Sequence, residues 1–191
     1  MSKQIGNSCF PATQNGRFAC KCKFEVRFSP TPYKNYDCIG LNHQLFYPKN
    51  FTNNVDAMLS ITSAYTAAIQ SGNLSNEKPI YMTLEPSELP PVTGASEGIA
   101  ALLAFLGCQM SENQMITGFV DTIGMTEEAV EDLVIKQIDE VRAKAEGAEK
   151  CGLTLFIPSG NVKDFGNIVP KHVVPVKTVG DAIKQIQQRK K

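Results

Sequence analysis

The sequence has no excess of charge of either sign. Its 191 residues carry 19 basic and 19 acidic side chains, so the formal net charge at pH 7 is zero. Proteins that bind nucleic acid through its phosphates concentrate lysine and arginine, and polyacidic tails concentrate carboxylates. The charge balance therefore argues against both classes. The basic ending Gln187–Lys191 is interpreted as a solvated helix end, and no nucleic-acid partner is predicted.

Long apolar segments are also missing. The longest apolar stretch, Ile99–Leu106, falls well short of the roughly 18 residues that a membrane-spanning helix needs. The beginning of the chain, Met1–Asn7, is polar apart from Ile5 and carries no targeting signal. We therefore expect a cytoplasmic protein without a membrane partner; if its source is viral, the compartment would be the host cytoplasm or the virion.

Histidine is scarce: only His43 and His172 occur, and neither lies at ligand spacing from the six cysteines. This pattern argues against a metal site, and we predict neither a metal nor another cofactor. The cysteines are expected to be free thiols in a reducing compartment. The phosphate-binding sequence Gly-x-x-x-x-Gly-Lys-Ser/Thr is absent, so we expect no ATPase module in this chain.

The hydrophobic pattern mixes strand and helix periods, which is typical of the α+β class. Residues 1–17 are interpreted as a polar lead and residues 18–191 as a single domain. The pattern predicts strands at 18–28, 36–47, 79–84, 115–123, 153–157 and 173–176. It predicts helices at 54–72, 96–107 and 126–150, and a last helix capped by Thr178 and Asp181.

The most informative segment joins a proline-rich loop to an apolar helix and reads Gly94-Ala95-Ser96-Glu97-Gly98. Free backbone N–H groups and the positive end of the helix dipole meet at such a helix start. A serine there is well placed as a nucleophile, because the N–H groups of Ser96 and Glu97 could bind the developing oxyanion. Serine is equally suited to a plain N-cap, and that interpretation stays open.

A serine nucleophile needs a base, and His172 is the only histidine that follows Ser96. A lysine can replace histidine when burial lowers its pKa from its usual value of about 10.4. On the helix expected at 126–150, Lys144 borders the apolar stripe, whereas Lys136 and Lys150 point away from it. Lys144 is therefore the best candidate for burial; the alternative is a snorkelling lysine that covers the edge of the core.

The order of these motifs resembles the proteolytic domain of Lon and its stand-alone relatives, which include the birnavirus processing proteases and use a Ser-Lys dyad. The resemblance covers roughly residues 58–186. The segments that carry it are Thr93–Ala100 around the serine, Thr117-Gly118, Lys144 with Cys151-Gly152, the strand Leu153–Ile157 with Pro158 and Asn161, and Val176–Ala182.

The resemblance implies a Lon protease-like fold (ribosomal protein S5 domain 2-like), in which mixed sheets pack against helices. It implies an ATP-independent serine endopeptidase, most simply a processing protease, acting on a protein or polypeptide. Ser96 would be the nucleophile and Lys144 the base, with Thr117 orienting the lysine. The helices that carry Ser96 and Lys144 are expected to pack side by side. The protein would act as a homo-oligomer or with separate partner proteins.

The sequence departs from the family at Glu97, where a small residue is usual, and in the segment before Lys144, where extra helix replaces a glycine-rich turn. Helix geometry predicts that Glu97 points outward, to solvent or to a neighbouring subunit. The departures leave a second hypothesis, a catalytically inactive Lon-like domain with a structural or assembly role. A third is a small-molecule kinase of related fold, although its phosphate-binding loop would have only Gly94 and Gly98.

Overall fold

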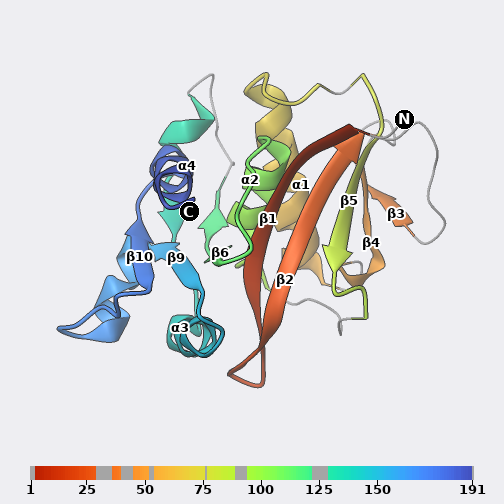
Figure 1. Ribbon diagram of the computed structural model, residues 1–191. Helices are drawn as coiled ribbons and strands as arrows, with labels where there is room; N and C mark the ends of the chain where they lie inside the picture. The colour runs from red at the N-terminus through yellow and green to blue at the C-terminus, as the bar shows by residue number, and fades with distance from the viewer. Residues whose placement is uncertain are drawn as a thin grey trace.

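The protein is described by a computed structural model over residues 3–28, 36–39, 45–51, 54–75, 77–88, 94–121 and 129–190. Its strands are β1 (Lys3–Gln14), β2 (Arg17–Phe28), β3 (Tyr36–Ile39), β4 (Leu45–Pro48), β5 (Ile80–Glu85), β6 (Gln114–Ile116), β7 (Phe119–Val120), β8 (Ile135–Lys136), β9 (Thr154–Pro158) and β10 (Val173–Val176). Its α-helices are α1 (Val55–Gln70), α2 (Gly98–Phe105), α3 (Val141–Lys150) and α4 (Val179–Gln188). The predicted α+β class is confirmed (Figure 1).

The larger sheet has the strand order β1-β2-β5-β4-β3, with β1 at one edge. Strands β1 and β2 form a long antiparallel hairpin, in which Phe10 is opposite Cys22. The ring of Phe10 stacks on that of Phe24, with centroids 4.6 Å apart. The predicted strand at 18–28 is confirmed as β2, and its alternating residues Cys22, Phe24 and Val26 are buried.

The prediction of a polar lead at residues 1–17 is wrong, because Lys3–Gln14 form β1. Cys9 and Phe10 lie in the core, and the polar residue Ser8 is buried beside them. The Ser8 hydroxyl donates to the carbonyl of Ala100 in α2, over 2.6 Å, so its burial leaves no unpaired hydroxyl. Pairing with β2 and a tertiary hydrogen bond to α2 thus include this polar segment in the fold.

Helix α2 is buried along its whole length, between α1 on one side and β1 with β2 on the other (Figure 1). A helix that is apolar all round has no face to offer to solvent, which explains this central position. Helix α1 begins as predicted: Asn54 is its N-cap, and Asn54 Oδ1 accepts a hydrogen bond of 2.9 Å from the N–H of Ala57.

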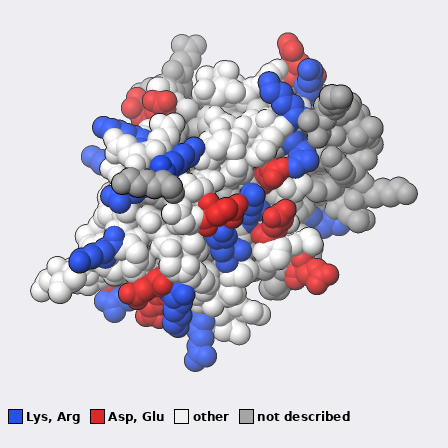
Figure 2. Space-filling view, in the orientation of Figure 1, with Lys and Arg blue, Asp and Glu red and all other residues white. Residues whose placement is uncertain are grey.

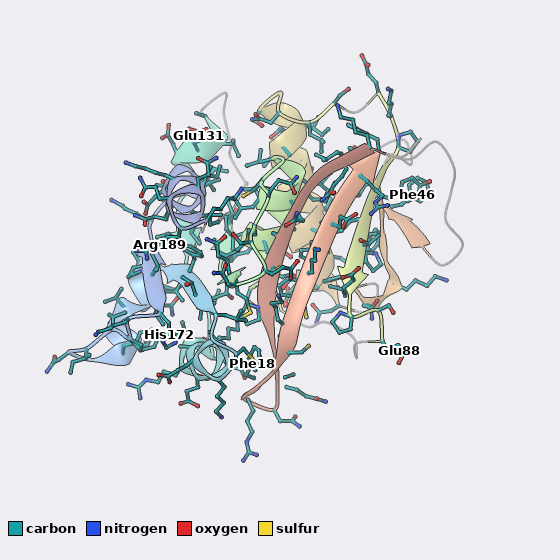
Figure 3. All side chains as sticks on the ribbon, viewed as in Figure 1. Phe18, Phe46, Glu88, Glu131, His172 and Arg189 are labelled. Atoms are coloured by element: carbon teal, nitrogen blue, oxygen red, sulfur yellow. The ribbon has the colours of Figure 1, made fainter. Side chains whose placement is uncertain are left out.

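A three-stranded sheet has β9 in the centre, parallel to both β10 and β6. Strands β7 and β8 form a separate two-stranded sheet. In Figure 1, α4 lies above the β9–β10 pair and α3 lies below it. Helix α4 is capped as predicted, since Thr178 Oγ1 accepts from the N–H of Asp181 over 3.2 Å. Helix α3 rests on β2 through Gly147, whose missing side chain leaves room for the ring of Phe18 (Figure 3).

The prediction of one long helix at 126–150 is wrong. Its first residues, 126–128, lie outside the described residues; the rest forms a 3-10 turn at Val130–Asp132, strand β8 and only then α3. Val134, a member of the predicted apolar stripe, is 52% exposed. The side chain of Asn161 bonds both the N–H and the carbonyl of Ile138, at 3.1 and 2.8 Å, and so supplies partners that a helix would have supplied.

The helices that follow Ser96 and carry Lys144 are predicted to pack side by side, against a shared sheet or against each other, and the structure has the shared sheet, since both contact β1 and β2. Helix α2 packs on α1 and β1, whereas α3 packs on β2, β1 and β9. The two helices therefore share β1 as a common support and do not form a helix pair. Their shared support still brings the start of α2 and the first turn of α3 to one cleft.

The substitution Phe10→Ala tests whether the first residues belong to the fold. Loss of a buried, stacked ring should lower the free energy of unfolding by about 3–5 kcal/mol. Lys3→Ala, an exposed position in the same strand, is the control and should change it by less than about 0.5 kcal/mol. Urea unfolding gives both values, and equal small effects would contradict the placement of β1 in the core.

Candidate active site

A cleft of approximately 700 Å³ opens where the tip of the β1–β2 hairpin meets the segments that lead into α2 and α3. The hairpin contributes residues 10–15 and Ala19, and the segment before α2 contributes residues 94–97. Residues 137–140 and Lys144 form the opposite wall, with Phe119. The structure thus brings Ser96, Glu97 and Lys144 to one cavity.

Lys144 is buried, with a relative exposure of 3%, as its place beside the apolar stripe predicted. Its ammonium nitrogen Nζ donates a hydrogen bond of 3.2 Å to Thr117 Oγ1. Burial lowers the pKa of Lys144 to about 8, and the negative charges of Glu97, Glu140 and Asp139 act in the opposite direction. A substantial fraction of this amine is therefore neutral in mildly alkaline solution, unlike an exposed lysine.

Thr117 connects the lysine to the serine segment. Its hydroxyl donates to the carbonyl of Ser96 over 3.2 Å, while it accepts from Lys144 Nζ. Its backbone N–H donates to the carbonyl of Phe156 in β9. The next residue, Gly118, donates its N–H to the same Ser96 carbonyl over 2.8 Å, so the backbone of Ser96 is held by two donors. The structure thus brings Thr117 together with both members of the predicted dyad.

Ser96 lies in the turn before α2 and is half-buried. The N-cap residue of α2 is Glu97, without a side-chain cap bond, so the N-cap interpretation of Ser96 is wrong. Among the described residues, Ser96 Oγ has no hydrogen-bond partner, and it makes no direct bond with Lys144 Nζ. Ser96 and Lys144 line the same cleft, and no group in the described part of the chain engages the serine hydroxyl.

The prediction that Glu97 points outward is wrong, since its relative exposure is 1%. Because α2 is enclosed on all sides, a side chain in its first turn that leaves the cleft meets α1 and not water. There Glu97 Oε1 accepts a hydrogen bond of 2.6 Å from Ser60 Oγ. Burial raises the pKa of Glu97 to about 7, opposed by the bonds from Ser60 and from its own backbone N–H and by the charge of Lys144.

The two predicted oxyanion donors, the backbone N–H groups of Ser96 and Glu97, belong to residues that line the cleft. They lie in the turn that leads into α2, where backbone N–H groups are not all used within the helix. Both remain candidate donors to an oxyanion.

The remaining candidate groups lie elsewhere. His172 does not line the cleft; its Nε2 is 2.9 Å from the carbonyl of Ala145, on α3. The cysteines at 9, 20, 22, 108 and 151 are free thiols. Within the part of the chain that the structure describes, no group of three or more His, Cys, Asp or Glu side chains is arranged to hold a metal ion. No helix in the described ranges is both long enough and apolar enough to cross a membrane.

Basic and acidic side chains are interspersed across the face of the molecule that Figure 2 shows. Lys21 and Lys23 illustrate this, since both form ion pairs with Glu112, at 3.0 and 3.4 Å. Partly or fully exposed pairs of this kind contribute little to stability.

No protein-family model matches the chain, and no curated protein matches it significantly.

The sequence did not predict the role of Ser60. The helical period places it on the buried face of α1, together with Ala57, Ile61 and Ala64. A buried serine at this position signals a hydrogen-bond partner, but its partner Glu97 is distant in sequence and belongs to another helix.

Thr117→Val is predicted to destabilise the protein by about 1–3 kcal/mol, because the methyl group leaves Lys144 Nζ without its acceptor in a buried site. Thr117→Ser keeps the hydroxyl and should recover most of the loss. Urea unfolding at neutral pH measures both variants. A valine variant as stable as the wild-type protein, together with a destabilised serine variant, would show that the methyl packing of Thr117, and not its hydroxyl, is what matters.

Proposed function

We propose that this protein is an ATP-independent serine endopeptidase of the Lon-like type, with Ser96 as nucleophile and Lys144 as general base. The observation that carries the proposal is a lysine that is buried, has a lowered pKa and shares a cleft with an unbonded serine hydroxyl. A lysine must be neutral to accept a proton from serine, and burial is the usual way to achieve this. The mixed α+β architecture and the order of the motifs are compatible with the Lon-like fold.

In the proposed reaction, the Ser96 hydroxyl rotates toward Lys144 and attacks the carbonyl carbon of a peptide bond. The neutral amine of Lys144 takes the hydroxyl proton as the new C–O bond forms. The backbone N–H groups of Ser96 and Glu97 bind the oxyanion. Lys144 then gives the proton to the leaving amine, and the acyl-enzyme is hydrolysed by a water that the same lysine deprotonates. Thr117 keeps Nζ directed toward the serine segment through its hydroxyl.

The cleft fits a polypeptide substrate. One of its walls is the end of the edge strand β1, residues 10–15, and an extended chain can lie along such a strand. Pro11 lies in this wall and has no N–H, so this position can accept a hydrogen bond from a substrate but cannot donate one. A site of this size suits cleavage at an accessible segment of a polypeptide, which favours a processing protease.

The alternative is an inactive Lon-like domain with a structural or assembly role. It is favoured by two features: among the described residues Ser96 Oγ makes no direct bond with Lys144 Nζ, and the charge of the buried Glu97 carboxyl group favours the protonated form of Lys144. The kinase hypothesis gains no support, because a carboxyl group buried at the start of α2 would repel a bound phosphate. Covalent labelling separates the protease from both alternatives.

A fluorophosphonate, which phosphonylates activated serines with loss of fluoride, should modify the wild-type protein once, at Ser96. Intact-mass spectrometry with peptide mapping detects the adduct. Ser96→Ala should abolish labelling, whereas Ser75→Ala, at an exposed serine, should leave it unchanged. Absence of labelling in the wild-type protein, or labelling that persists in Ser96→Ala, would favour the inactive domain.

The labelling rate should also depend on Lys144 and on pH. Because the neutral amine is the active form, the rate should rise as the pH increases through about 8, where the lysine loses its proton. Lys144→Arg stays charged and should lose roughly 100-fold or more in rate. Lys150→Arg, on the exposed end of α3, is the control. An arginine variant at 144 that reacts like the control would remove Lys144 from the mechanism.

A further inference from the structure

Behind the cleft, Ser60 and Glu97 form a buried polar pair that the proposed reaction does not use. Their relative exposures are 2% and 1%. Ser60 Oγ lies 2.6 Å from Glu97 Oε1 and 3.0 Å from the carbonyl oxygen of Ala57, one turn earlier in α1. Both neighbours are within hydrogen-bonding distance, but a serine hydroxyl has a single hydrogen.

This arrangement can serve both protonation states of the carboxyl group. When Glu97 is neutral, its proton can be donated to Ser60 Oγ while the serine hydrogen bonds the Ala57 carbonyl. When Glu97 is ionised, the serine hydroxyl can turn its hydrogen to the carboxylate. The Ala57 carbonyl then keeps the acceptor role it has within α1. Neither state leaves a buried donor without an acceptor, so Glu97 can gain or lose a proton without repacking the helix start.

The charged groups around the pair determine what this proton controls. Glu97 and Lys144 are both buried and line the same cleft. The charges that act on Glu97 are those of Lys144 on α3 and Asp56 on α1. Lys144 in turn faces Glu97, and faces Asp139 and Glu140 at the start of its own helix. Asp139 and Glu140 are exposed, so water screens their charges; Glu97 is buried, and its charge acts through the protein interior.

We propose that Glu97 and Ser60 are positioning residues for Lys144. The buried Glu97 carboxylate, bonded by Ser60, keeps the Lys144 amine protonated near neutral pH, so that the base becomes available only at higher pH. The proposal rests on the proposed role of Lys144 as base. From the fully protonated pair, the first proton leaves the Glu97 carboxyl for solvent, and the anion formed then favours the Lys144 ammonium. The second proton leaves Lys144, and the base becomes available.

Coupling of this kind has a measurable signature. As Glu97 ionises with rising pH, the pKa of Lys144 is raised, so the lysine titrates over a wider pH range than one isolated group. Glu97→Gln removes the charge but keeps an amide that can donate to Ser60 Oγ. In this variant the lysine should titrate as a single group and at lower pH, since the anion that favoured the ammonium is gone.

The experiment is an NMR titration of the intact protein labelled with ¹³C at lysine Cε, with the Lys144 signal assigned by its loss in Lys144→Arg. Glu97→Gln should lower the midpoint of that signal by about one pH unit. Near pH 7 this corresponds to an increase in fluorophosphonate labelling rate of up to about tenfold. Glu146→Gln makes the same change on the exposed face of α3 and should leave the midpoint where it is. Equal midpoints in the two glutamine variants would overturn the proposal.

Ser60→Ala provides a second test that does not depend on how well the glutamine is accommodated. Loss of the hydroxyl removes a donor that stabilises the carboxylate, so Glu97 should titrate at higher pH. The ¹³C NMR signal of Glu97 Cδ measures this titration. An unchanged Glu97 titration would contradict the role of Ser60. Both titrations are read without any proteolysis. A protein that shows the coupling but no labelling at Ser96 would disprove the protease and not the coupling.

Discussion

The arrangement of the cleft depends on the burial of one amine, that of Lys144. Lys144 projects from the first turn of a short helix that is held against β1, β2 and β9, and the cost of burying its ammonium appears as a lowered pKa. Thr117 supplies the acceptor that a buried amine requires, and it is positioned by the backbone of β9. Since the same threonine also bonds the Ser96 carbonyl, the serine segment is placed by the group that satisfies the lysine.

The second constraint is the complete burial of α2. A helix without a solvent face forces every side chain of its entering turn either into the cleft or into the core, and Ser96 and Glu97 are divided between the two. The carboxyl group inside the core would be costly as an unpaired anion. It is accommodated because Ser60 can donate to it or accept from it, and because its pKa lies near neutrality.

Local signals in the sequence were sufficient where neighbours along the chain decide the structure. The Asn54 cap of α1, the alternation of β2 and the burial of Lys144 all follow from spacing. These local signals failed where a residue distant in the sequence determines the structure. Pairing with β2 and the bond from Ser8 to Ala100 place β1 in the fold, Asn161 bonds the backbone of the segment before α3, and Ser60 of α1 bonds Glu97. These side-chain hydrogen bonds join residues that are remote in sequence, so periodicity could not reveal them.

The way Asn161 holds residues 137–140 has a consequence for how this protein can diverge. One amide side chain replaces a neighbouring strand for the backbone of Ile138, so this wall of the cleft is held by side-chain contacts and not through a continuous ladder of backbone hydrogen bonds. Insertions or deletions between β8 and α3 would then leave the strands of the sheets intact. That segment is the place where a lineage, or a protein engineer, could alter which sequences the cleft admits while the lysine and serine keep their supports.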